Sequence, residues 1–332
     1  MPNEKQMIFH TERSEKPAPG LAHRFARHVC LLLAAAFAQT ALGSENAPHR
    51  PFAQWADLPD KGQFVLGLVY EESESYHIWA SGKQYGINTR SGGENYGIDI
   101  NQGYFALQYG ITEKWAADLE IGGTTAGWRA FSFGNQIRST TGLMDWGLGV
   151  RYQIFNEAQC TNSPWIPTLT FRAGAVLPGS YNQDLAYAPG FRSAAIEPEF
   201  LLRKHFGWPG LGFYGDTLYR WNRTTGNDNF IIAVGLFQQI KGWELDVGYM
   251  HLQTLSGGDI TFTIPGDLAS IVYPRDVREN NDSIQAGFSY TTSRRHWRYG
   301  FHTRTIVDGN NSDSKFWIGG SIDIPFGGKH SD

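Results

Sequence analysis

Short segments of about ten residues, apolar at every second position, recur between Gly62 and Phe326. The gaps between these segments alternate between short and long. Such a segment can cross a membrane as a tilted β-strand, with one face toward lipid and the other toward a polar interior. Soluble β proteins share the apolar alternation, but they have no reason to alternate short turns with long loops. The pattern therefore predicts an all-β fold, a closed antiparallel transmembrane β-barrel of the bacterial outer membrane.

The apolar faces of the clearest segments carry large aliphatic and aromatic residues, while the opposite faces carry charged or small ones. Three such faces are Phe64, Leu66, Leu68 and Tyr70; Trp115, Ala117, Leu119 and Ile121; and Trp243, Leu245, Val247 and Tyr249. About twelve strands of this kind fit between residues 62 and 326. An even number places both chain ends on the periplasmic side, as single-chain bacterial barrels require.

Turn signals divide the predicted connections into two sets. Tight turns are expected at 110–114, 207–210, 241–242 and 293–295, and longer loops at 72–96, 124–141, 178–195, 254–282 and 308–314. Short turns are typical of the periplasmic end and longer loops of the outer end. The longest loop contains a second apolar stretch at 259–264, which either forms a hairpin above the membrane or folds inward as a constriction.

The strongly apolar run from Val29 to Ala38 follows Arg24 and Arg27, and it is too short to span a bilayer as a helix. Basic residues, an apolar centre and small residues are typical of a secretory signal, with cleavage after Ala38 or after Gly43. The alternative is a buried helix of a soluble domain. We predict a signal peptide with an extended N-terminus at 1–43, a periplasmic lead-in at 44–61, the barrel at 62–326 and a C-terminal tail at 327–332.

The composition agrees with a barrel and gives no sign of nucleic-acid binding or of a disulfide-rich fold. Gly contributes 39 residues, aromatics 14% and charged residues only 18%. The net charge of −4 gives no footprint for nucleic acid. The mean hydropathy of −0.36 is compatible with a barrel, because half of each strand faces a polar interior. Signal cleavage removes Cys30 and leaves Cys160 as a lone thiol, which excludes an intramolecular disulfide framework.

Three segments resemble one family of outer-membrane barrels. Residues 109–115 read YGITEKW, residues 142–152 read GLMDWGLGVRY, and a Pro-to-PGSY stretch spans 167–181. These resemble the hairpin, the Gly-Asp strand and the strand-and-loop motif of the barrels named for the MetA pathway of phenol degradation. Met144 and Ser180 depart from that pattern. The resemblance implies a channel or transporter-like protein for small hydrophobic or aromatic compounds, and it transfers no catalytic or ligand residue.

Inward positions of the predicted strands carry charges of both signs. The lumen-lining candidates are Asp118, Glu120, Asp145, Arg151, Arg172, Glu244, Asp246, Arg298, His302 and Arg304, with Asp323 on the last strand. They either pair across the lumen and hold the barrel together, or form opposed acidic and basic walls that orient a solute. A barrel of about twelve strands is intermediate in width, with either a narrow pore or a lumen blocked by a loop or by the N-terminal segment.

Outward aromatic residues point to the partners of the barrel. Trp115, Trp146, Trp243, Trp297 and Tyr249 are expected in interfacial girdles that contact outer-membrane lipid. The last strand ends on Phe326, which resembles the signal that the barrel-assembly machinery reads during biogenesis. The expected partners are therefore lipid, this machinery and a small solute, and no nucleic acid.

The sequence holds no motif for a catalytic, cofactor or metal site. A barrel enzyme acting on lipid would need a Ser nucleophile beside a His base. His251, His296, His302, Ser289 and Ser293 are the available residues, but their spacing matches no known arrangement. We predict that the protein is not an enzyme. The alternatives are a lipid-modifying barrel enzyme, a surface barrel without transport, and at the level of fold a soluble β-sandwich or lipocalin-like barrel.

Overall fold

The computed structural model describes residues 55–80, 83–86, 98–129, 137–160, 165–182, 192–206, 210–223, 226–262, 271–272 and 277–328. The predicted signal peptide, residues 44–54 of the lead-in, residues 329–332 of the tail and parts of several loops lie outside these ranges. Within them, no helix is long and apolar enough to cross a membrane.

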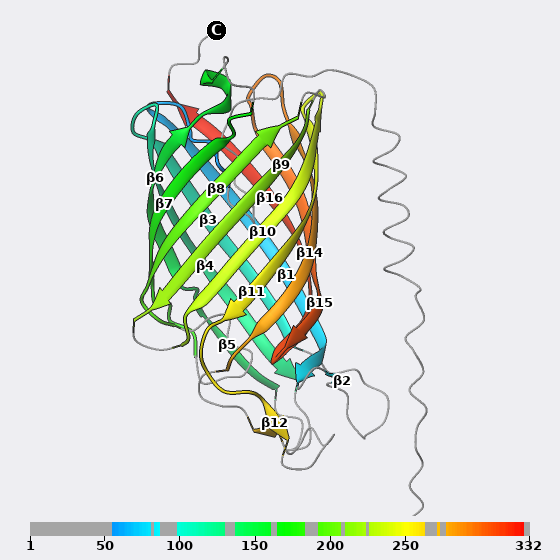
Figure 1. Ribbon diagram of the computed structural model, residues 1–332. Coiled ribbons are helices and arrows are strands. Elements are labelled where there is room, and N and C mark those ends of the chain that lie inside the picture. The colour runs from blue at the N-terminus through cyan, green and yellow to red at the C-terminus, as the bar shows by residue number, and fades with distance from the viewer. Residues whose placement is uncertain are drawn as a thin grey trace, which may run out of the picture. The chain divides into compact units, whose positions relative to one another are not determined.

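The described chain is almost entirely β-strand (Figure 1). The strands are β1 (Gln63–Ala80), β2 (Lys83–Gly86), β3 (Ile98–Gly110), β4 (Trp115–Arg129), β5 (Ile137–Leu143), β6 (Trp146–Phe155), β7 (Thr168–Leu177), β8 (Ala195–His205), β9 (Leu211–Asn222), β10 (Asn229–Ile240), β11 (Trp243–Thr254), β12 (Thr261–Phe262), β13 (Ile271–Val272), β14 (Asn280–Thr291), β15 (Arg298–Asn310) and β16 (Ser312–Gly327). One short 3-10 helix, η1 (Glu157–Gln159), lies between β6 and β7.

Antiparallel pairing closes the sheet into a barrel. Each long strand pairs with the next along the chain, and β16 returns to pair with β1 from Gln63↔Gly327 to Trp79↔Ser312. Strands β5 and β6 pair with successive parts of β4, so together they occupy one strand position. Twelve positions encircle the barrel, which confirms the predicted fold. Both terminal strands begin or end at the edge with the short turns, here called the periplasmic rim.

Alternation of burial along the strands separates lipid-facing from interior residues. In β1, Val65, Val69 and Glu71 are buried, whereas Tyr70 is 55% exposed. The predicted outward faces in β4 and β11 follow the same rule. Trp115 and Trp243 are exposed, and their rings are tilted against those of Tyr152 and Tyr290, at 4.7 and 4.9 Å between ring centroids. A closed wall with an apolar outer face is what a bilayer requires.

Several strands are longer than the sequence predicts. Strand β1 extends to Ala80, through about a third of the loop predicted at 72–96, and β4 and β5 occupy much of the loop predicted at 124–141. The loop predicted at 308–314 is a tight connection at Asn311, whose φ of 57° lies in the left-handed region that Asn tolerates. Beyond the membrane, outward residues become polar, so apolar alternation ends while strand pairing continues.

The longest outer loop contains a small two-stranded sheet of β12 and β13, as a hairpin does. Residues 263–270 between these strands, and 273–276 after them, lie outside the described part. At the base of the loop, Asn311 donates hydrogen bonds to Asp259 at 2.8 Å and to the Arg278 carbonyl at 2.9 Å.

The turn predicted at 241–242 is a two-residue hairpin with positive φ at both positions, 48° at Lys241 and 84° at Gly242. A Cβ atom at residue 242 would also lie 2.8 Å from the Thr291 carbonyl oxygen. We therefore expect Gly242→Ala to lower the free energy of unfolding by about 1–2 kcal/mol. Urea unfolding of the protein in lipid vesicles measures this change. Gly127→Ala is the matched control, because nothing lies within 4 Å of a Cβ atom there; equal effects of the two variants would contradict the prediction.

Candidate functional site

Residues 55–59, here called the lumenal segment, fold into the barrel interior. The side chains of Trp55 and Ala56 are only 3% and 1% exposed, and Leu58 is buried. The segment departs from the periplasmic rim, where the Gly62 amide donates a hydrogen bond to the Gly110 carbonyl at 2.7 Å. The sequence predicts this part as a periplasmic lead-in. Its contacts with inward side chains agree with the alternative in which the N-terminal segment occupies the lumen.

The indole of Trp55 fills a pocket of interior side chains, here called the aromatic seat. The seat consists of Tyr214 on β9, Ala233 and Phe237 on β10, and Met250 on β11. The Phe237 ring meets the indole edge-on, at 5.4 Å between centroids and 67° between planes. A Cβ atom at Gly235 would come within 2.5 Å of the Tyr214 hydroxyl. Glycine at that position therefore leaves room for the Tyr214 ring along the wall.

Polar contacts fix the backbone and the carboxylate of the lumenal segment. The Thr170 hydroxyl donates to the Ala56 carbonyl at 2.5 Å, and Arg151 Nη1 donates to the Trp55 carbonyl at 3.4 Å. Arg203 Nη2 donates to Asp57 Oδ1 at 2.6 Å, and Arg203 Nε lies 2.6 Å from Oδ2. The same guanidinium lies 5.5 Å from the centroid of the Trp55 ring. The segment thus crosses the lumen from the rim at β3 to interior side chains of β6 to β11.

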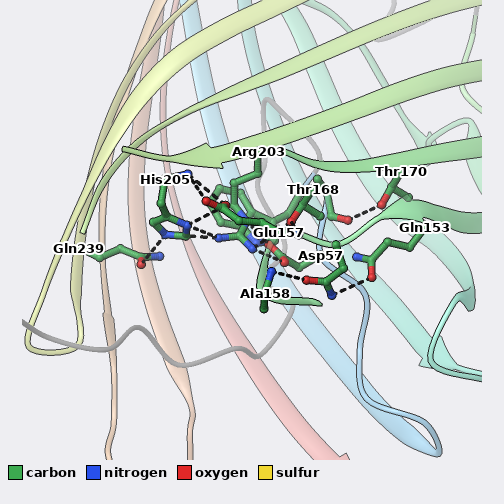
Figure 2. Close-up of polar contacts among 12 residues, drawn as sticks. Asp57, Gln153, Glu157, Ala158, Thr168, Thr170, Arg203, His205 and Gln239 are labelled. Carbon is green, nitrogen blue, oxygen red and sulfur yellow. Dashed lines mark hydrogen bonds and ion pairs between the residues drawn. The ribbon is translucent and has the colours of Figure 1, made fainter. Parts of the chain in front are cut away.

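A cluster at the periplasmic rim holds the end of β8, as Figure 2 shows. Glu157 in η1 accepts hydrogen bonds from Lys204 Nζ at 2.6 Å and from the His205 amide at 3.1 Å, and its carboxylate lies 3.2 Å from His205 Nδ1. His205 in turn lies 2.8 Å from Arg203 Nη1. The cluster therefore positions the arginine that binds Asp57.

Three predicted lumen residues form one network on neighbouring strands. Asp118 on β4 accepts from Arg151 Nε at 3.0 Å and from Arg172 Nη2 at 2.8 Å. Arg172 also approaches Glu197 and Glu199 on β8, at 3.5 and 3.3 Å. Sequence reasoning missed these two glutamates, although the alternation of Ala195, Glu197, Glu199 and Leu201 could have placed them on the inward face.

The predicted residues of β11 and β15 form separate contacts elsewhere in the barrel. Arg298 donates to Glu244 at 2.8 Å and to the Ser289 hydroxyl at 2.8 Å. The His302 ring lies 3.1 Å from Glu71, a residue that the prediction did not include. The Arg304 guanidinium lies 3.9 Å from the centroid of the Trp317 ring.

The remaining candidates occupy three different settings. Glu120 on β4 and Asp246 on β11 lie on the inward faces of their strands and are partly buried, and Asp323 on β16 is buried. Asp145 lies between β5 and β6, outside both strands. Its carboxylate accepts from the Gly179 amide and the Tyr181 hydroxyl, both at 2.8 Å, and so fastens the outer loop that follows β7.

The residues considered for a hydrolase are bound in other ways. His302 contacts Glu71, His251 lies 2.7 Å from Asp282, and Ser289 accepts from Arg298. His296 lies in the turn before β15 with a φ of 53°. Among the described residues, no group of three His, Cys, Asp or Glu side chains could hold a metal ion.

Comparison with known proteins bears on the fold. No family model matches the chain, and no curated protein sequence is detectably similar to it. Among solved structures, the chain is similar to the COG4313 outer membrane channel from Pseudomonas putida F1, with a TM-score of 0.60 and 15% identity over 80% of this chain and 96% of that one. The chain has the fold of an outer-membrane β-barrel.

Two autotransporter barrels are less similar to this chain. The translocator domain of NalP from Neisseria meningitidis has a TM-score of 0.43 and 12% identity, over 92% of this chain and 96% of that one. The β domain of the Bordetella autotransporter BrkA has a TM-score of 0.46 and 11% identity, over 80% and 100%. Similarity at this level adds nothing to the assignment of the fold.

The network around Arg172 yields a stability prediction. Its side chain and that of Asp118 are about one-tenth exposed, and removal of one partner of a buried ion pair leaves an uncompensated charge. We expect Arg172→Gln to lower the free energy of unfolding by about 3–5 kcal/mol. The control is Arg278→Gln at an ion pair that is 44% exposed on each side, where the loss is about 0–1 kcal/mol. Urea unfolding compares them, and similar losses would refute the role of burial.

Glu157 predicts a dependence of stability on pH. Burial raises its pKa, but hydrogen bonds from Lys204 and His205 outweigh burial and hold the pKa below its usual value. Such a carboxylate stabilises the fold above its unfolded pKa of about 4.3, and this contribution is lost as pH falls through the folded pKa. We expect the stability difference between wild type and Glu157→Gln to shrink as pH falls from about 5. Glu113→Gln, in an exposed turn, is the control, and a difference independent of pH would contradict the assignment.

Proposed function

We propose that this barrel is an outer-membrane channel for small solutes, hydrophobic or aromatic ones among them, and that the lumenal segment holds it closed. The observation that carries the proposal is the way the segment is bound. Trp55, Ala56 and Asp57 are held by side-chain contacts from the wall. The segment is not one of the strands that close the barrel. Its departure would therefore leave the wall intact.

The aromatic seat supports the solute class. Tyr214, Phe237 and Met250 are apolar or aromatic side chains on the inward faces of three adjacent strands. Without the indole they form an apolar patch in an interior that also carries many charged side chains, and burial of a ring there is favourable. The resemblance to phenol-degradation barrels supports the same class.

The charged residues of the interior would line the path of the solute. We assign this role to Asp118, Glu120, Asp145, Arg151, Arg172, Glu244, Asp246, Arg298, His302 and Arg304. Close pairing of Asp118 with Arg172, and of Glu244 with Arg298, supports a structural role for these charges above that of an orienting field. Charges within a membrane-spanning wall need such partners.

We also propose that assembly of the barrel depends on the end of β16. Phe326 faces outward, is exposed, and stacks on Phe64 of β1 at 5.3 Å between ring centroids. This residue therefore stands at the seam where the first and last strands meet, which supports its recognition by the barrel-assembly machinery.

Conductance across a planar bilayer tests the channel. We expect refolded wild-type protein to be mostly closed, and Trp55→Gly combined with Asp57→Asn to conduct several-fold more current, because the segment loses both its ring and its carboxylate contacts. Migration on gels before and after heating checks that both proteins are folded barrels.

Trp165→Ala is the matched control, since this indole is 89% exposed and lies outside the lumen. Equal conductance of wild type and the double variant would show that the segment is not the gate. If neither wild type nor the double variant conducts although both are folded, the protein is not a channel. A lipid-modifying enzyme or a surface barrel would then be the better explanation.

A further inference from the structure

The lumenal segment presents two chemical groups to the wall, each with its own partner. The Trp55 ring lies in the aromatic seat, and the Asp57 carboxylate pairs with Arg203. Arg203 also faces the indole, so one guanidinium lies beside both groups. A ring and a carboxylate held side by side constitute the pharmacophore of a small aromatic acid.

We propose that the aromatic seat and Arg203 form a binding site for a small aromatic carboxylate, and that the lumenal segment occupies this site as an internal mimic of the ligand. The proposal deepens the channel function above and rests on it. It assigns the ring of the solute to Tyr214, Phe237 and Met250, and the carboxylate to Arg203.

The geometry of the seat favours a planar ring. Tyr214 and Phe237 are each 1% exposed with the indole in place. The Tyr214 hydroxyl accepts a hydrogen bond from Gln285 Nε2 at 2.8 Å, which fixes the orientation of its ring. Phe237 offers an edge-to-face contact, and the thioether of Met250 favours aromatic neighbours. An empty seat would expose these side chains to water, so a second ring stabilises the open state.

The setting of Arg203 favours a carboxylate. Arg203 Nη2 donates a hydrogen bond to Asp57 Oδ1 at 2.6 Å, and Nε lies 2.6 Å from Oδ2 in a close ion pair. A guanidinium is well suited to a carboxylate in such a place. The arginine side chain is only 12% exposed. When Asp57 leaves, this charge loses a close counterion in a poorly hydrated place, which is costly. A ligand carboxylate restores the pair, whereas a neutral ring does not.

Arg203 is also held by wall residues that do not belong to the lumenal segment. His205 lies 2.8 Å from Nη1, and Thr168 Oγ1 accepts from Nη2 at 3.4 Å. Glu157 holds His205 from the far side (Figure 2). The guanidinium is therefore pre-organised for the next carboxylate after the segment has moved.

The ligand and the lumenal segment compete for the same site, the aromatic seat and Arg203. A ligand that binds only the vacated site shifts the equilibrium toward the unplugged barrel, and the segment lowers the apparent affinity in proportion to its occupancy. Binding and opening are then a single event.

The experiment is equilibrium binding of indole-3-acetate to purified full-length protein in detergent. We expect Trp55→Ala combined with Asp57→Asn to bind this probe on the order of tenfold more tightly than wild type, because the internal competitor is lost. Arg203→Gln added to that variant should weaken binding on the order of tenfold, through loss of a charge-assisted hydrogen bond. Indole and acetate, each with half of the chemistry, should bind more weakly than indole-3-acetate.

Trp165→Ala and Arg278→Gln are the controls, since both residues are exposed and neither makes the contacts described here for the aromatic seat or Arg203. Equal affinity of wild type and the double variant, or no effect of Arg203→Gln, would overturn the proposal. If the double variant does not fold, the single variants Trp55→Ala and Asp57→Asn make the same comparison. Binding in detergent needs no current, so tight binding without conductance would refute the channel and keep the site, and conductance without binding would do the reverse.

Discussion

The requirement that no backbone polar group face lipid unpaired governs this molecule. A bilayer offers no water to strand edges, so the pairing of β16 with β1 is the contact on which the rest depends. Closure turns one face of every strand inward. It thereby creates an enclosed volume in which Asp118, Arg172 and Glu244 can be charged within a membrane.

That enclosure explains the chemistry of the interior. Charges removed from bulk water need partners, and the observed pairs join neighbouring strands, such as β4 with β6 and β7. Glycines permit this arrangement. A Cβ atom at Gly149 would lie 2.7 Å from Arg172 Nε, so the guanidinium lies flat against the wall only because that side chain is missing. On the periplasmic side, the lumenal segment adds its own contacts to this interior, through Thr170 and Arg203.

Apolar alternation made the strands and their outward faces predictable, because lipid imposes a period of two wherever a strand crosses it. The apolar alternation ends where a strand leaves the lipid. The outward residues Glu72 and Glu74 continue the ladder of β1 above the membrane, yet in sequence they read as loop. The break at Met144 and Asp145 was not predicted either, because residues 142–152 read as one stretch of strand and residues 137–141 as loop.

The interior site was the least predictable part. Glu197 and Glu199 lie on a readable alternating strand, whereas the lumenal segment has no periodicity of its own. Trp55 packs against Tyr214, Phe237 and Met250. These residues are distant from it in sequence and come together only when the barrel closes. The sequence allowed the alternative that the N-terminal segment blocks the lumen. Which residues that segment contacts depends on tertiary structure and could not be predicted.

The shortness of the connection between Asp57 and Gln63 has a kinetic consequence. Six residues reach at most about 20 Å, so a released segment remains at the mouth of the barrel. Its return is intramolecular, at an effective concentration in the millimolar range for a short flexible tether. In the channel proposed above, such a tether would close the barrel again without a partner protein. A solute would then have to be abundant enough to compete with a segment that stays attached. A channel of this kind would suit plentiful compounds better than scarce ones.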